Sequence, residues 1–129
     1  MTTSPEWDAA LKTYLGCRAL LDLDNELGDI AETRRQHEMT PRDEAASARH
    51  SRALREHNVR FKTPLIEAVV ALVAAPAPDL DAVATKRVAA GRSAKVCPEL
   101  MAGAFDLIAA DIERLTGVSM SKTDLRAAA

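Results

Sequence analysis

The segment from Thr63 to Ala75 constrains the fold more than any other part of the chain. It reads Thr-Pro-Leu-Ile-Glu-Ala-Val-Val-Ala-Leu-Val-Ala-Ala, and Glu67 is its only ionisable side chain. A helix that is apolar on every face cannot lie in water, so neighbouring elements must cover it on most sides. The segment is also far too short to span a bilayer. It therefore predicts the central helix of a soluble all-α domain, with longer amphipathic helices before and after it.

The composition favours helices throughout. Ala alone occupies 25 of the 129 positions, whereas only 3% of the residues are aromatic. Cys17 and Cys97 stand alone without CxxC spacing, and no apolar signal segment follows Met1. We therefore expect a cytoplasmic protein whose thiols are small buried groups. One helical domain is expected over residues 1–117, followed by a mobile tail over residues 118–129.

Proline residues predict the helix starts, because proline is tolerated in the first turn, where its missing N–H has no partner. Four dipeptides follow this rule: Ser4-Pro5, Thr40-Pro41, Thr63-Pro64 and Cys97-Pro98. Gly91 and Gly117 predict helix ends. The expected helices cover residues 5–37, 41–62, 63–75, 79–90 and 98–116. The buried face expected for the fourth consists of Leu80, Val83, Ala84 and Val88.

The apolar face of the first helix changes direction along its length. Trp7 and Tyr14 lie on one face, whereas a later group lies on a rotated face: Leu20, Leu23, Leu27 and Ile30. This helix should therefore change partners or break near residues 20–24, with its second half packed on the next helix. Pro64 should form a kink or a tight junction, because neither glycine nor a polar loop accompanies it.

The charge changes sign between successive segments. Residues 1–33 carry seven acidic and two basic side chains, whereas residues 34–62 carry four and eight. Opposite signs suit two helices that fold back on each other, although a basic surface for a polyanion or an acidic protein is the alternative. The predicted fold is all-α, with four to five helices that form a long antiparallel charged hairpin on a compact helical base.

The helix over residues 41–62 has a narrow apolar stripe among its basic residues. The stripe consists of Ala46, His50, Ala53, Leu54, His57 and Phe61. The basic residues are the strongest functional signal in the chain. The predicted partner-binding residues are Arg49, Arg52, Arg55, His57 and Arg60.

Three segments resemble the framework of a group of small uncharacterised helical proteins from high-GC bacteria and their prophages or plasmids. These segments are Trp7-Asp8-Ala9-Ala10 leading to Tyr14, then Ala75-Pro76-Ala77-Pro78-Asp79-Leu80-Asp81-Ala82, and Ala109-Ala110-Asp111-Ile112-Glu113-Arg114-Leu115. The resemblance implies a mobile-element accessory protein with a role in host interaction. It implies no activity, cofactor or catalytic residue, and the basic middle of this chain departs from the group.

Motifs for catalysis or metal binding are incomplete. Asp22, Asp24 and Glu26 start like a calcium loop, but Leu27 and Thr33 stand where that loop needs Gly and Glu. His37, His50 and His57 lack the close spacing of zinc ligands and are expected in the hairpin seam or at a contact surface. The Ser119–Lys122 match to SxxK lacks its companion motifs. We therefore predict no catalytic, cofactor or metal residues.

Two functional hypotheses follow. The first is a non-enzymatic helical protein-interaction module that binds a host protein or a second copy of itself, in which case two hairpins would cover Leu20, Leu23, Leu27 and Ile30. The alternative is a small nucleic-acid-binding accessory protein that uses the basic helix at residues 42–62. Neither hypothesis involves a membrane or a cofactor.

Overall fold

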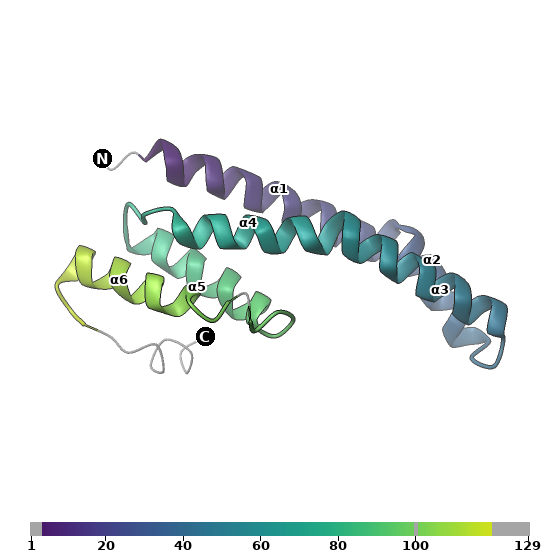
Figure 1. Ribbon diagram of the computed structural model, residues 1–129. Coiled ribbons are helices and arrows are strands. Elements are labelled where there is room, and N and C mark those ends of the chain that lie inside the picture. Colours follow the sequence, from purple (N-terminus) through teal and green to yellow (C-terminus); the bar gives the residue numbers. More distant parts are fainter. Residues whose placement is uncertain (1–3, 100, 120–129) are drawn as a thin grey trace. The chain divides into compact units, whose positions relative to one another are not determined.

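The computed structural model describes residues 4–99 and 101–119, and every regular element within these ranges is helical (Figure 1). The elements are α1 (Pro5–Leu27), α2 (Asp29–Met39), α3 (Glu44–His57), the π-helical turn η1 (Asn58–Lys62), α4 (Thr63–Ala74), α5 (Leu80–Ala94) and α6 (Ala104–Thr116). The predicted all-α fold is confirmed. Of the expected tail, residues 120–129 lie outside the described residues.

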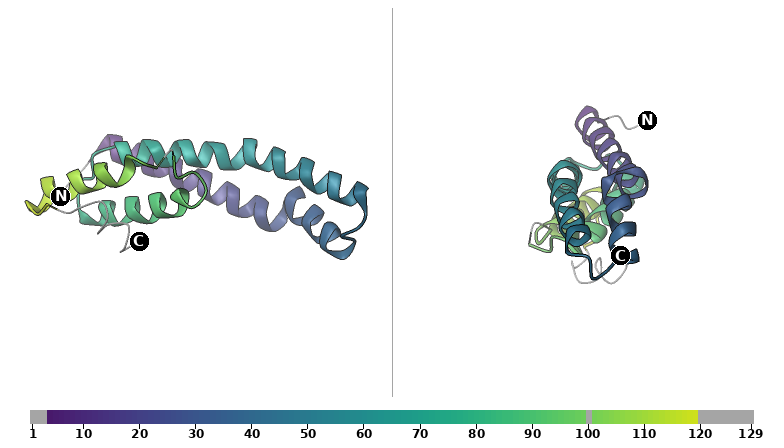
Figure 2. Two further views of the ribbon diagram at one scale, coloured as in Figure 1. Left: turned by 60° about the horizontal axis from the view of Figure 1, so that its bottom comes forward. Right: turned by 90° about the vertical axis from the view of Figure 1, so that its right-hand side faces the viewer.

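The chain divides into two compact units. Unit 1 contains Met1–Tyr14 and Ile66–Ala129, and unit 2 contains Leu15–Leu65. Helices α1 and α4 each contribute residues to both units. Unit 2 holds the predicted hairpin, because α2 packs against α3, as both views in Figure 2 show. Unit 1 holds the helical base, in which α5 packs against α6.

The hairpin turn differs from the prediction at Pro41. Helix α3 begins at Glu44, because the carboxylate of Asp43 accepts hydrogen bonds from the backbone N–H groups of Ala45 and Ala46 at 2.9 and 3.4 Å. Thr40 ends α2, and its hydroxyl donates to the carbonyl oxygen of Gln36 at 2.7 Å. An aspartate at the N-cap position forms these bonds better than threonine, so the helix starts after Asp43 and not at the predicted Thr40-Pro41.

The first predicted helix breaks at Gly28 and not within residues 20–24. The expected change of face is wrong, because the buried side chains of α1 are Trp7, Tyr14 and Leu21, which lie seven residues apart on one face. Of the predicted rotated group, only Ile30, which lies in α2, is buried, whereas Leu20, Leu23 and Leu27 are exposed. Leu21 takes the inward position instead. A rotation of one residue along a helix moves a side chain by about 100°, which is enough to exchange the buried and exposed faces.

Pro64 lies in a helical path that continues from α3 into α4. The backbone N–H of Thr63 donates to the carbonyl oxygen of Asn58, which is the wide spacing of a π-turn. A wider turn relieves the clash between a proline ring and the carbonyl group of the preceding turn. The predicted tight junction is therefore a single π-turn between two α-helices.

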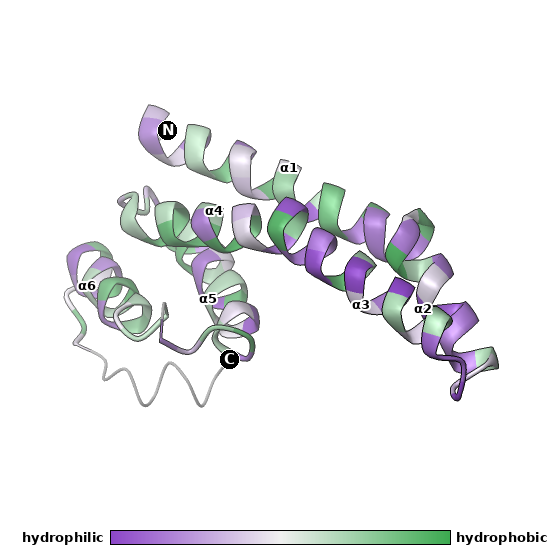
Figure 3. Ribbon diagram, turned by 45° about the vertical axis from the view of Figure 1, so that its right-hand side comes forward, coloured by the Kyte–Doolittle hydropathy of each residue, from purple (hydrophilic) through white to green (hydrophobic). Residues whose placement is uncertain are grey.

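The apolar helix α4 is the core element of unit 1, and it is mostly green in Figure 3. Within unit 1, its buried side chains are Ala68, Val69, Leu72 and Val73, and Trp7 and Tyr14 of α1 are also buried. The cover is less complete than predicted, because Val70 remains 44% exposed. Helix α4 is therefore covered on one broad face and not on most sides, contrary to the prediction.

Helices α5 and α6 differ from the predicted bounds. Helix α5 passes through Gly91 to Ala94, and α6 begins at Ala104, since turns occupy the described residues between Lys95 and Gly103. Gly117 ends α6 with a left-handed φ of 76°, as predicted. Cys17 and Cys97 are free and half-buried, so the expectation of buried thiols is wrong.

The buried face of α5 also differs from the prediction. Only Val83 of the expected group is buried, whereas Leu80, Ala84 and Val88 are exposed. The inward face carries Lys86, which is 1% exposed, together with Ala82, Ala89, Ala90 and Ser93. The pattern of apolar residues did not predict this buried face, because an analysis of hydrophobic spacing assigns a lysine such as Lys86 to the surface.

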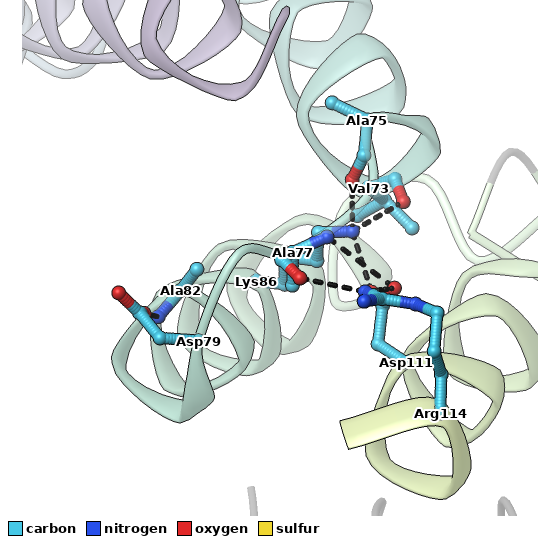
Figure 4. A network of polar contacts seen from close by, with 8 residues as sticks. All are labelled: Val73, Ala75, Ala77, Asp79, Ala82, Lys86, Asp111 and Arg114. Atoms are coloured by element: carbon cyan, nitrogen blue, oxygen red, sulfur yellow. Dashed lines mark hydrogen bonds and ion pairs between the residues drawn. The ribbon is translucent and has the colours of Figure 1, made fainter. Parts of the chain in front are cut away.

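Lys86 is buried because all three of its N–H donors have acceptors (Figure 4). Its Nζ donates to the carbonyl oxygen of Val73 at 2.9 Å, to that of Ala75, and to Oδ2 of Asp111 at 2.6 Å. The two carbonyl groups belong to the C-terminal end of α4, where helices have unpaired acceptors and a partial negative charge. The ammonium group also lies 5.7 Å from the centre of the Trp7 ring.

Asp111 extends this network to the connector between α4 and α5. Its Oδ1 accepts from the backbone N–H of Ala77 at 3.4 Å and from Nη2 of Arg114 at 3.0 Å. Nη2 of Arg114 also donates to the carbonyl oxygen of Ala77 at 2.6 Å. One lysine and one aspartate thus join the end of α4, the connector, α5 and α6.

We predict that Lys86→Met lowers the free energy of unfolding by about 3–5 kcal/mol, because it leaves a buried carboxylate without its cation. Asp111→Asn should have an effect of similar size, and the double variant should lose clearly less than the two single losses added together. Denaturant titrations that follow Trp7 fluorescence measure these values. Lys12→Met replaces an exposed lysine of unit 1 and should change stability by at most about 0.5 kcal/mol. If the loss of unfolding free energy in the double variant equalled the sum of the two single losses, the proposed interaction between Lys86 and Asp111 would be contradicted.

Candidate functional site

The predicted arginine face lies on the surface of unit 2. Arg49, Arg52 and Arg55 of α3 and Arg60 of η1 are all exposed. Within residues 4–99 and 101–119, none of these four arginines forms an ion pair, although the guanidinium of Arg60 lies 5.8 Å from the centre of the Phe61 ring. Their charges are therefore available to a partner.

His57 does not belong to this surface, so its place in the predicted partner-binding set is wrong. It is 3% exposed, and its Nδ1 lies 2.5 Å from Oδ2 of Asp24. An ionised carboxylate can only accept, so Nδ1 carries the proton. The Phe61 ring covers His57, with ring centres 5.7 Å apart, and Nε2 is buried without a partner. The contact fastens α1 to α3 within unit 2.

The other two histidines lie in the hairpin seam, which was one of the two positions predicted for them. The His37 and His50 rings stack with their centres 5.6 Å apart, and Nδ1 of His50 lies 3.2 Å from the hydroxyl of Thr33. In the part of the chain that the structure describes, no three His, Cys, Asp or Glu side chains are grouped so that they could hold a metal ion.

An exposed leucine stripe runs along the part of α1 in unit 2. We define the stripe as Leu20, Leu23 and Leu27, which are 55%, 54% and 78% exposed. The spacing of three and four residues places them on one face of the helix. Beside them is a pocket of about 320 Å³, which is also lined by Asp24, Gly28 and Phe61. Exposed apolar surface that forms a continuous patch marks sites of interaction.

The leucine stripe has charges of opposite sign on its two borders. At about 100° per residue, Asp22 and Glu26 lie on one side of the stripe, and Asp24 lies on the other. Asp22 and Glu26 are exposed, whereas Asp24 turns toward His57. The Asp24 side carries Phe61 and the exposed Arg60. Asp22 is paired with Arg18 at 3.5 Å, so Glu26 is the carboxylate of that border that forms no ion pair among the described residues, and Arg60 is the exposed cation near the other border.

Sequence reasoning found the leucines and the arginines but missed the pair that joins α1 to α3. Asp24 and His57 are separated by 33 positions, and no spacing rule links residues so far apart. The one local signal was Gly28. A Cβ at this position would lie 1.9 Å from Oδ1 of Asp24, so glycine is the residue that leaves room for the carboxylate.

The two glycines of the first predicted helix should therefore respond in opposite directions to alanine. We predict that Gly28→Ala destabilises unit 2 by about 1–3 kcal/mol, because the new methyl group displaces Asp24 from His57. Gly16→Ala should stabilise it by about 0.5–1 kcal/mol, since a Cβ there meets nothing within 4 Å and alanine favours the helix. Thermal unfolding followed by circular dichroism tests both. Equal melting temperatures for the two variants would contradict the assignment.

The framework segments of the resemblance lie in unit 1, at the start of α1, in the connector between α4 and α5, and in α6. The stripe and the arginine face lie in unit 2. Within the described ranges, no helix has both the length and the apolar character needed to cross a membrane. Comparison of the chain with protein-family models, with curated proteins and with solved structures finds no match.

Proposed function

We propose that the protein is a non-enzymatic helical interaction module that binds a second copy of itself through the leucine stripe. The observation that carries the proposal is the exposure of Leu20, Leu23 and Leu27 on one face of α1, beside a pocket. The pocket of one copy offers a place for an apolar side chain of the second copy, such as Leu27 of that second copy. A host protein with a similar apolar helix is the other occupant that this surface would accept.

The energetics favour a weak dimer. Covering the exposed half of a leucine contributes about 1 kcal/mol, so three leucines on each of two chains contribute about 6 kcal/mol. The loss of translational and rotational freedom on association costs a free energy of comparable size. Complementary charges at the borders then decide the balance. We expect a dissociation constant on the order of 0.1–1 mM.

The charged borders select one orientation of the two copies. A two-fold axis parallel to α1 exchanges the two borders, so the acidic border of each copy meets the basic border of the other. A two-fold axis across the stripe would place acid over acid and base over base. The pairing is therefore parallel, with Glu26 of one copy near Arg60 of the other.

The exposed leucines provide a matched test. Leu15 is also 54% exposed in unit 2, but it lies about 80° around the helix from Leu23 and outside the stripe. We predict that the wild type and Leu15→Glu dimerise with rising concentration, whereas Leu23→Glu remains monomeric. Sedimentation velocity at concentrations up to about 1 mM measures this. A monomeric wild type, or equal loss in both variants, would refute pairing through the stripe.

The arginine face supports a second candidate function, the binding of nucleic acid. Its basis is the exposure of four arginines without ion pairs over α3 and η1. Exposed guanidinium groups bind phosphates bidentately, and a helix fits a major groove. Because this surface differs from the stripe, dimerisation and nucleic-acid binding can be tested separately.

We predict that changing Arg49, Arg52, Arg55 and Arg60 to Gln strongly weakens the salt-sensitive binding to a short DNA duplex. The slope of log K against log salt should fall by about 3–4, because four phosphate contacts are lost. Gel shifts at several salt concentrations measure the slope. A variant with Arg34→Gln and Arg35→Gln, which changes exposed arginines of α2, is the control. Binding that survives the fourfold change would exclude this face.

The cellular setting is part of the proposal. Cys17 and Cys97 are both free, which supports a reducing compartment such as the cytoplasm. The resemblance of the framework segments supports a mobile-element accessory protein. An interaction module of this kind would act on host components through the same stripe or arginine face.

A further inference from the structure

A larger pocket lies in unit 1, away from the surfaces of the proposed function. It has a volume of about 640 Å³ and is formed by α5 and by the turns that precede α6. Met101 and Phe105, both almost fully buried, form an apolar floor. Ala84 and Gly91 of α5 leave the wall open, because neither has a side chain that would fill it. The volume lies within the range of natural small-molecule sites.

The charged side chains that line this pocket in the described part of the chain are basic. They are Arg87, Arg92 and Lys95. Among the residues that the structure describes, none of these three cations forms an ion pair. Nε of Arg87 is buried and has no hydrogen-bond acceptor. A buried N–H group without an acceptor is unfavourable, so a ligand that supplies an oxygen atom would complete the site.

We infer that this pocket binds a small amphipathic carboxylate. The carboxylate would pair with Arg87 and with Arg92 or Lys95, since a guanidinium group matches a carboxylate through two parallel hydrogen bonds. The apolar chain would lie over Met101 and Phe105. A fully polar anion would leave the apolar floor uncovered, and a neutral apolar molecule would leave the Arg87 donor without an acceptor. The combination of a charged rim and an apolar floor therefore selects a ligand that has both parts.

Isothermal titration calorimetry of the full chain with three probes tests the inference. Octanoate has both parts of the expected ligand, acetate has only the carboxylate, and 1-octanol has only the chain. We expect octanoate to bind at least tenfold more tightly than either of the other probes. Equal binding of acetate would show a general anion site, and equal binding of octanol would show an apolar site. Either result, or no binding of octanoate, would overturn the inference.

Two variants locate the site. Arg87→Gln removes the guanidinium group that carries the unpaired donor, and Ala84→Leu fills the pocket from an exposed position that the core does not use. Each should weaken octanoate binding at least tenfold, whereas Arg49→Gln on α3 of unit 2 should leave it unchanged. Circular dichroism confirms that the variants are folded. Full affinity in folded Ala84→Leu would place octanoate elsewhere and overturn the assignment.

Discussion

The buried ammonium group of Lys86 is the interaction on which the architecture of unit 1 depends. Removing a charge from water is strongly unfavourable unless its surroundings replace the lost hydration. Here the replacement comes from the end of α4, where Val73 and Ala75 supply carbonyl groups, and from Asp111 of α6. The backbone N–H of Ala77, which a continued helix would direct to the carbonyl group of Val73, donates to Asp111 instead. The chain thus satisfies with one lysine the acceptors that a helix end normally presents to water.

Unit 2 uses a different solution to the shortage of large apolar side chains on α3. Its inward stripe contains alanine and histidine, so it gains little from the hydrophobic effect. Polar contacts between Asp24 and His57 and between Thr33 and His50 supplement the packing. The large apolar groups Leu20, Leu23 and Leu27 remain outside. Unit 2 thus buries Leu21, Ile30 and Leu65 together with alanines, and leaves the leucine stripe exposed.

Periodicity and composition predicted the all-α fold, the hairpin and the inward stripe with Ala46, Ala53 and His57, because these depend on local spacing. Helix bounds were predicted less well. The helix after the hairpin turn is capped by Asp43 and not by the predicted Thr40, which lies three residues earlier, and only the folded geometry decides between two such positions. The burial of Lys86 was beyond prediction. It depends on Asp111, which lies 25 positions away, and on the exact end of α4. Likewise, the arginine face was visible in the sequence, but the pocket beside Arg87 required the folded turns before α6.

The seclusion of Lys86 also gives unit 1 a built-in chemical reporter. Acylating reagents modify lysine amines only when these are deprotonated and accessible. In the folded chain, Lys86 is neither free nor accessible, whereas Lys12 and Lys95 are exposed on the same unit. The labelling rate of Lys86 relative to those two lysines, resolved by mass spectrometry, therefore reports how often unit 1 opens under native conditions.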